Sequence, residues 1–270
     1  MNVVTQEALG TDKMIVRKAD NVGWMIFNNP RRRNAVSMDM WRAVAEIIQG
    51  FQADDDVRVA VMMGAGDQAF VSGADISEFE KARANAAAEK EYSRVSATAL
   101  DALAGFDKPL IAMIHGYCIG GGVGVALAAD IRIASDTSQF AIPAARLGLG
   151  YGYHAVKVLA DLVGPAMAKD ILFSARRLSA EEALRIGLVN RVVPHGDLEA
   201  VTRDYVAKIV ANAPLTIRAA KAAIGEVLKD AANRDLAAVE RKVRDCFDSA
   251  DFVEGRRAFM EKRRPAFRGE

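Results

Sequence analysis

Apolar residues recur along the chain either in short continuous or alternating runs, which predict strands, or every three to four residues, which predicts helices. Segment 37–54 repeats its apolar residues at helical spacing, and Ser37 precedes them as a candidate N-cap. Its predicted buried face holds Met40, Trp41, Val44, Ile47, Ile48 and Phe51. Short apolar runs predict strands at 13–20, 22–28, 58–66, 109–116 and 130–135, with a further strand-like run that ends at Gly73. Because strands alternate with helices, we expect an α/β fold with much parallel pairing.

The second half of the chain is predicted to be almost entirely helical, because the strand pattern nearly vanishes beyond residue 145. Ser179 and Glu182, three residues apart, match a capping box at the start of one of these helices. Helices are expected at 75–83 and 87–106 in the first half, and within 155–164, 166–175, 179–187, 197–213, 215–230 and 236–247 in the second.

The composition limits the classes of partner. Lysine and arginine number 36 against 35 aspartates and glutamates, so the near-neutral chain gives no general reason to expect nucleic acid or a membrane surface as a partner. Its two cysteines, Cys118 and Cys246, form neither a disulfide framework nor a metal motif. No apolar run approaches the roughly 20 residues of a membrane span. We therefore expect a cytoplasmic protein without a membrane or nucleic-acid partner.

Cofactor and metal motifs are weak in this sequence. Segment 150–155 matches the dinucleotide pattern G-x-G-x-x-A, but Pro143 and Arg146 interrupt the region where its preceding strand would run. The three histidines, His115, His154 and His195, lie far apart, and G-x-S-x-G is absent. The sequence therefore predicts neither a metal site nor a nicotinamide cofactor.

Three adjacent glycines, 120–122, separate a predicted buried strand from an apolar helix that carries no charge before Asp130. Such a turn leaves the first N–H groups of the helix unpaired, as in sites that bind anions. Segment 73–75 predicts a second helix start, which Asp75 could cap. If the two segments faced each other, their N–H groups could form an oxyanion hole. A glycine-lined packing contact between helix and sheet is the alternative.

Five segments, in this order, resemble blocks of the crotonase superfamily, the enoyl-CoA hydratase/isomerase fold. They are NNPRRRNAVSMDMW at 28–41, SGADISEF at 72–79, IHGYCIGGG at 114–122, ARRLSAEEALRIGLVNRVV at 175–193 and EGRRAFMEKRRPAFRG at 254–269. The resemblance covers essentially the whole chain. It implies a spiral core of ββα turns with an acyl-CoA site, residues 1–200, and a C-terminal helical region, residues 201–270, that assembles a homotrimer or hexamer.

The resemblance also implies a set of site residues. The backbone N–H groups of Ala74 and Gly121 would form the oxyanion hole. The remaining substrate and coenzyme A contacts would come from Arg33, Ser72, Asp75 and Ile76, together with Phe259 and Lys262 of a neighbouring copy of the chain. Coenzyme A would arrive as part of the substrate, so no separate cofactor is expected.

The chain departs from the family pattern where proton transfer is carried out. Gly124 and Ala144 stand where hydratases carry two glutamates, and Gly152 replaces a further acid of hydrolase and dehalogenase relatives. Because general acid–base catalysis needs an ionisable group, we expect an acyl-CoA enzyme that stabilises a thioester enolate but is not an ordinary hydratase.

Two alternatives remain open. Tyr151 resembles in position a tyrosine of the methylmalonyl-CoA decarboxylase branch, which favours decarboxylation of a malonyl-type thioester. The missing glutamates also permit a non-catalytic acyl-CoA binder. An RNA-binding role, known in one branch through a lysine-rich helix, is not favoured because segment 81–94 balances its charges.

Overall fold

The computed structural model describes residues 2–3, 9–75 and 86–270, which form two sheets with helices around them. The predicted helix at 75–83 lies almost wholly outside these ranges. The larger sheet has seven strands in the order β1 (Asn2–Val3), β2 (Met14–Ala19), β3 (Val22–Phe27), β4 (Val59–Gly64), β6 (Leu110–Ile114), β8 (Ile131–Ser135) and β11 (Arg191–Val193). Strands β1 to β3 are antiparallel, and the pairs from β3 to β11 are parallel, as the alternation of strands and helices predicted.

A second, smaller sheet consists of four short strands, three of which directly follow strands of the larger sheet. Its order is β10 (Leu178–Ser179), β9 (Gln139–Ala141), β7 (Tyr117–Ile119) and β5 (Ala69–Val71). Each of β4, β6 and β8 is followed by one of these short strands, so the chain repeats a ββ step and builds the expected ββα spiral. The sequence pattern did not resolve β7 or β9, because three residues are too few for a period.

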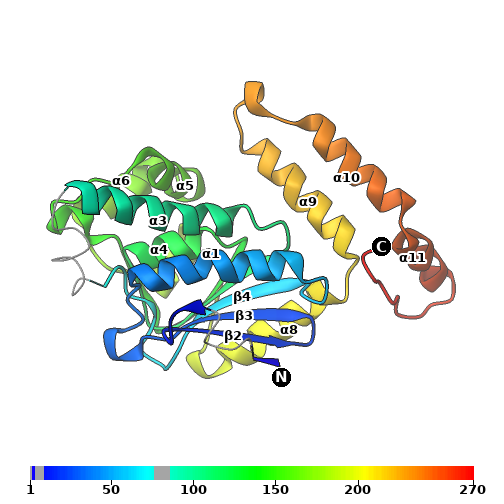
Figure 1. Ribbon diagram of the computed structural model, residues 1–270, viewed down its shortest axis with the longest axis horizontal. Helices are drawn as coiled ribbons and strands as arrows, with labels where there is room; N and C mark the ends of the chain where they lie inside the picture. The colour runs from blue at the N-terminus through cyan, green and yellow to red at the C-terminus, as the bar shows by residue number, and fades with distance from the viewer. Residues whose placement is uncertain (1, 4–8, 76–85) are drawn as a thin grey trace.

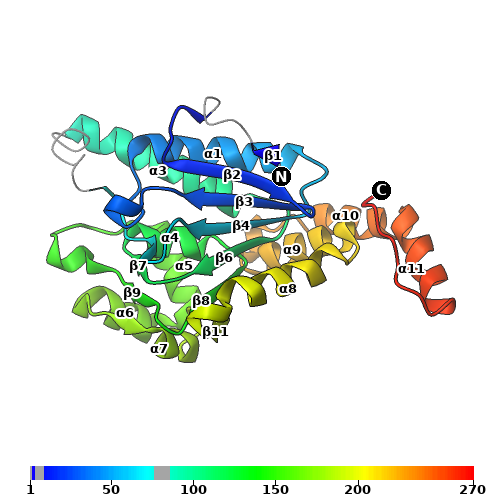
Figure 2. The same ribbon diagram turned by 90° about the horizontal axis from the view of Figure 1, so that it is seen from below.

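Helices cover both faces of the larger sheet (Figures 1 and 2). Helices α1 (Met38–Ala53), α3 (Ala86–Ala104) and α4 (Gly121–Leu127) share one apolar core with one face of the sheet. Helix α8 (Leu198–Val210) packs against the other face, through Leu198 and Val206. Alternate strand residues such as Trp24 and Met25 therefore enter different cores.

Helix α1 forms as the sequence predicted. The Ser37 hydroxyl accepts a hydrogen bond from the Met40 N–H, and every residue of the predicted apolar face is at most 5% exposed. At the other end, the buried Lys108 ammonium donates to the carbonyl oxygens of Phe51 and Asp54 at 2.7 and 2.8 Å. A cation on the last carbonyls of a helix stabilises its C-terminus.

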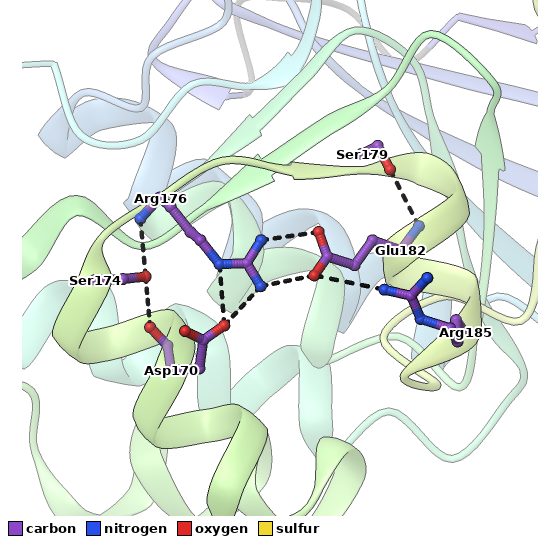
Figure 3. Close-up of polar contacts among 6 residues, drawn as sticks. All are labelled: Asp170, Ser174, Arg176, Ser179, Glu182 and Arg185. Carbon is purple, nitrogen blue, oxygen red and sulfur yellow. Dashed lines mark hydrogen bonds and ion pairs between the residues drawn. The ribbon is translucent and has the colours of Figure 1, made fainter.

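The helices after residue 150 follow the predicted order and begin with α5 (Tyr153–Val163), α6 (Pro165–Ser174) and α7 (Ala180–Arg185). Ser179 Oγ accepts from the Glu182 N–H at 3.1 Å, as the capping box predicted. The Glu182 carboxylate instead accepts two hydrogen bonds from Arg176, which also binds Asp170 (Figure 3). This bidentate pairing ties the end of α6 to the start of α7 and fixes the backbone between them.

The last helices are α9 (Pro214–Val227), α10 (Leu236–Asp248) and α11 (Ala250–Met260). Figure 1 shows α9 and α10 as an antiparallel pair that projects away from the sheets, with α11 following α10 near the start of α9. The predicted helical C-terminal region is confirmed, but β10 and β11 are strands in a part of the chain expected to be almost wholly helical. Short 3-10 helices lie at Pro30–Arg32 (η2), Pro143–Arg146 (η4), His195–Asp197 (η5) and Ala231–Asn233 (η6).

Candidate functional site

The structure brings the two glycine-containing segments of the sequence together. Gly121 is the first residue of α4, and Ala74 lies just beyond the end of β5. A Cβ atom placed on Gly121 would lie 3.8 Å from the Ala74 nitrogen, and one placed on Gly73 would lie 3.9 Å from the Gly121 nitrogen. The two backbone N–H groups are therefore neighbours, although they are 47 positions apart in the sequence.

The backbone around Ala74 is held by residues 33–36, which run alongside it. Val36 N–H donates to the Gly73 carbonyl at 2.8 Å, and Asp75 N–H donates to the Val36 carbonyl at 3.0 Å. In this parallel pairing the Ala74 N–H faces the other way. Within the described ranges, neither the Ala74 nor the Gly121 N–H donates to a backbone carbonyl. Two such donors can stabilise negative charge that develops on one oxygen.

The three adjacent glycines, 120–122, have different structural roles. Gly120 takes φ 56° and ψ −115°, a conformation that residues with a Cβ rarely adopt, and so turns the chain from β7 into α4. Gly121 places its N–H beside that of Ala74. Gly122 lies so close to β5 that a Cβ would come within 2.0 Å of the Val71 carbonyl oxygen. The packing contact considered as the alternative is thus the role of Gly122.

The positions without glutamates leave space beside α4. A Cβ on Gly124, one turn along the helix from Gly121, would meet nothing within 4 Å, and the same holds for Gly152. Ala144 is buried, in η4, and the preceding Pro143 lies beside Gly120. None of these three side chains can bind or release a proton.

A positively charged cluster lies around Tyr117, at the opposite end of β7 from Gly121. The guanidinium carbons of Arg33 and Arg177 lie 5.1 and 5.3 Å from the centre of the Tyr117 ring. Both arginines are exposed, and the described part of the chain offers neither a carboxylate partner. The ion pairs of Arg176, shown in Figure 3, hold the backbone beside Arg177. We call Arg33, Tyr117 and Arg177 the arginine–tyrosine cluster.

Sequence reasoning named Arg33 but missed Tyr117 and Arg177. The pairing of β7 with β9 and of β9 with β10 brings the two side chains together. Arg177 stands next to Arg176 in the sequence, and nothing in the pattern distinguishes the arginine that is neutralised by carboxylates from the one that is not. Trp41 was predicted only as a core residue, yet its ring comes within 3.8 Å of the place that a Cβ of Gly121 would occupy.

Other predicted residues lie in different places. Ser72 Oγ donates to the Arg32 carbonyl at 3.2 Å, and Asp75 is buried beside Ala74. Tyr151 lies in the loop between η4 and α5 and is 37% exposed. Ile76 lies outside the described residues.

Phe259 and Lys262 lie at the far end of the molecule from α4. Phe259 is 83% exposed on α11, and Lys262 follows that helix (Figures 1 and 2). One chain therefore does not join them to the paired N–H groups. Their predicted contribution from a neighbouring copy stays a prediction.

The pKa values of two buried side chains, His115 and Cys118, are shifted toward the neutral form. His115 is 5% exposed, and burial, together with the nearby His195, lowers its pKa. Burial raises the pKa of the Cys118 thiol far above its ordinary value, so that thiol stays protonated. Over the ranges that the structure describes, no group of three or more His, Cys, Asp or Glu side chains is placed to hold a metal ion, and no helix is long and apolar enough to cross a membrane.

Comparison with known proteins assigns this arrangement to a family. Residues 17–270 match the family model of enoyl-CoA hydratase/isomerase. A short-chain-enoyl-CoA hydratase of Clostridium acetobutylicum is 34% identical over 253 residues, which are 94% of this chain and 96% of that protein. A carnitinyl-CoA dehydratase of Escherichia coli K12 is 32% identical over 88% of this chain and 92% of its own.

The fold agrees with that of solved structures. The crystal structure of an enoyl-CoA hydratase/carnithine racemase from Magnetospirillum magneticum superposes with a TM-score of 0.92 at 34% identity, and the match covers 96% of this chain and 97% of that one. The similarity in sequence and in fold spans nearly the whole chain, and the protein therefore belongs to the enoyl-CoA hydratase/isomerase family of the crotonase superfamily.

Proposed function

We propose that the protein binds an acyl-CoA thioester and stabilises its enolate between the N–H groups of Ala74 and Gly121. The observation that carries this proposal is the pairing of two backbone N–H groups that no backbone carbonyl of the described chain occupies. When the α-carbon of a thioester becomes electron-rich, negative charge moves to the carbonyl oxygen. Two fixed donors stabilise that charge without reorganisation during the reaction.

The arginine–tyrosine cluster supports the coenzyme A part of the proposal. Tyr117 lies four residues before Gly121, which at about 3.3 Å per residue is a separation of up to about 13 Å. An extended pantetheine arm can cover such a distance between the thioester and the phosphates. Arg33 and Arg177 would then bind phosphate oxygens, and the Tyr117 ring would hold the two guanidinium groups in place.

The reaction that follows enolate formation does not use glutamates at the two usual positions. Gly124 and Ala144 cannot activate water or protonate the α-carbon. Relatives of this chain are named as hydratases and dehydratases, but we propose that this chain is an isomerase or lyase with little hydratase activity. A positioned acid or base contributes about 10² to 10⁴-fold, so hydration of crotonyl-CoA is expected near background.

Decarboxylation of a malonyl-type thioester is the second candidate, and the absence of an ionisable side chain at Gly124 and Ala144 favours it. In this reaction the bond from the α-carbon to the carboxylate breaks, carbon dioxide leaves, and the electron pair forms the enolate directly. No base is needed, and the enolate carbon then takes one proton. Tyr151 would supply that proton or orient the leaving carboxylate. The missing glutamates also leave open a non-catalytic acyl-CoA binder.

The variant Gly121→Pro tests the enolate proposal. Proline lacks the N–H and is well tolerated at the first position of a helix, so α4 can form without this donor. A panel of acyl-CoA thioesters, followed by mass spectrometry, should show conversion by the wild-type protein and none by a folded variant that still binds coenzyme A. Conversion by the folded variant at the wild-type rate would overturn the enolate proposal. Turnover of crotonyl-CoA by the wild-type protein at the rate of an ordinary hydratase would instead contradict the expected loss of hydratase activity.

A further inference from the structure

The side chain of Trp41 packs against Gly121, one of the two residues that supply the paired N–H groups. Its Cζ2 atom would be 3.8 Å from a Cβ placed on Gly121, the same distance as the Ala74 nitrogen. Trp41 belongs to the first turn of α1 and is 2% exposed. The edge of one rigid aromatic ring and the two donors therefore meet around the same small volume.

Tyr92, on α3, fixes the orientation of this ring. The Trp41 Nε1–H donates to the Tyr92 hydroxyl at 3.1 Å, and both side chains are buried. An indole has a single polar hydrogen, and a buried donor without a partner costs about 1 to 3 kcal/mol. The hydrogen bond therefore selects one position of the ring between α1 and α3.

The local backbone conformation does not by itself fix the spacing of the two donors. Ala74 follows Gly73, which has φ 108°, and Gly121 follows Gly120, which has φ 56°. Glycine has more backbone freedom than any other residue, so neither N–H is fixed by its own local conformation. Gly121 also has no side chain with which to anchor itself. Hydrogen bonds with Val36 hold the backbone at Ala74, whereas the position of Gly121 relative to it depends on the groups that pack there, and Trp41 is a bulky, oriented group at that place.

We propose that Trp41, held by Tyr92, is a positioning residue that keeps the N–H groups of Ala74 and Gly121 at one spacing and excludes water from the oxygen that they bind. This inference rests on the proposed enolate stabilisation. Preorganised donors stabilise charge more strongly than donors that must reorganise, and more strongly in a dry site than in a wet one.

A chromophoric thioester measures the polarisation of the bound carbonyl. In para-dimethylaminocinnamoyl-CoA, charge moves from the amine toward the carbonyl oxygen, so hydrogen bonds to that oxygen shift the absorption to longer wavelength. The probe is titrated into the wild-type protein and into Tyr92→Phe and Trp41→Phe. Tyr92→Phe removes one hydroxyl and keeps the ring, whereas Trp41→Phe also withdraws the edge beside Gly121.

We expect a red shift in the wild-type protein, and a loss of about half of it or more in both variants at saturation. The dissociation constant of coenzyme A should stay within about threefold, because the arginine–tyrosine cluster is unchanged. Phe51→Leu is the matched control. Phe51 is a buried aromatic residue at the other end of α1, so its variant should lower the melting temperature without changing the red shift.

The outcomes separate this inference from the proposed function. A full red shift in Tyr92→Phe and Trp41→Phe would overturn the positioning role and leave the enolate proposal standing. The same loss of shift in Phe51→Leu would also overturn it, because any loss of core packing would then have that effect. A wild-type protein that binds the probe with no red shift would contradict the enolate proposal itself. If Trp41→Phe does not fold, Tyr92→Phe decides the question alone.

Discussion

Gly122 packs against the carbonyl oxygen of Val71 so closely that a single methyl group on Gly122 would come within 2.0 Å of that oxygen. Two residues further along α4, Gly124 has nothing within 4 Å of the place where its Cβ would be. Residues two apart on a helix point in nearly opposite directions, so one side of α4 is packed on β5 and the other faces open space.

These two glycines should respond differently to alanine. Gly122→Ala forces α4 away from β5 and should lower the free energy of unfolding by more than about 2 kcal/mol. Gly124→Ala removes a flexible residue from a helix and should raise it by up to about 1 kcal/mol. Urea denaturation followed by circular dichroism measures both. Equal destabilisation by the two variants would contradict the packing described for α4.

The arginine–tyrosine cluster should carry much of the affinity for coenzyme A. Arg33→Ala and Arg177→Ala should each weaken binding by about tenfold, since a hydrogen bond to a charged group contributes about 1.5 kcal/mol or more. The loss of affinity for coenzyme A should be smaller at high salt, where ions screen the exposed charges. Isothermal titration calorimetry with coenzyme A at two salt concentrations measures this.

Arg203 offers a matched control for the cluster. It also lies over an aromatic ring, that of Trp24, but on helix α8, on the other face of the larger sheet. Arg203→Ala should leave the affinity for coenzyme A unchanged. If all three variants weakened binding equally, the cluster would have no special role.

Features that depend on residues close together in the sequence are predicted well, and features that depend on distant residues are not. The buried face of α1, from Met40 to Phe51, follows from a local period and is recovered except for Ala43. The three-residue strands β7 and β9 are not, because they exist only through pairing with each other and with β5 and β10. The spiral itself therefore came from the resemblance to a family rather than from periodicity.

The candidate site divides in the same way. Glycines mark where backbone N–H groups are exposed, so Gly121 and the segment around Ala74 were recognisable from the sequence. The sequence does not show which side chains will contact each other. The contact between Tyr117 and Arg177 depends on the strand pairing in the smaller sheet, so it was recognised only in the structure. Glu182 shows the same limit, because its backbone N–H donates to Ser179 as the spacing predicted, whereas its carboxylate accepts from Arg176.

Assembly with further copies of the chain should bury exposed apolar side chains of α9, α10 and α11. Ile224, Val227, Phe247 and Val253 are each at least 60% exposed in the single chain. Because exposed apolar patches of this kind mark interfaces, we expect light scattering to give the mass of a trimer or hexamer at micromolar concentration. Val227→Asp should shift the mass toward the monomer with unchanged circular dichroism. A wild-type monomer would contradict the prediction and would remove Phe259 and Lys262 from the site.

Acid should destabilise the protein through His115. Burial and the charge of His195 lower its pKa in the folded protein, while Asp67 and the Gly66 backbone offset part of this effect. The unfolded chain, with a histidine pKa near 6.5, then binds more protons than the folded one. The contribution of His115 is complete above about pH 6.5 and decreases as the pH falls below that value, by at most about 1.4 kcal/mol per pH unit.

His115→Asn isolates this contribution, because asparagine does not titrate. The free energy of unfolding, measured from pH 5.5 to 7.5, should rise with pH more steeply in the wild-type protein than in the variant. The rings of His115 and His195 are 6.5 Å apart between their centres, so His195→Asn should change the slope less. Parallel curves for wild type and His115→Asn would refute the assignment.

Tyr151 decides between decarboxylation and a merely structural role in the acyl pocket. If its hydroxyl delivers a proton or holds the leaving carboxylate, Tyr151→Phe should lower kcat on methylmalonyl-CoA or a related malonyl thioester at least about tenfold, or about 1.4 kcal/mol, with little change in KM. Phenylalanine keeps the size and shape of the ring, so the comparison isolates the hydroxyl. Tyr153→Phe is the matched control, since Tyr153 is 74% exposed at the start of α5 and should keep the wild-type rate. An unchanged rate in Tyr151→Phe would reduce Tyr151 to a pocket wall, and a wild-type protein that releases no carbon dioxide from any malonyl-type thioester would end the decarboxylase candidate outright.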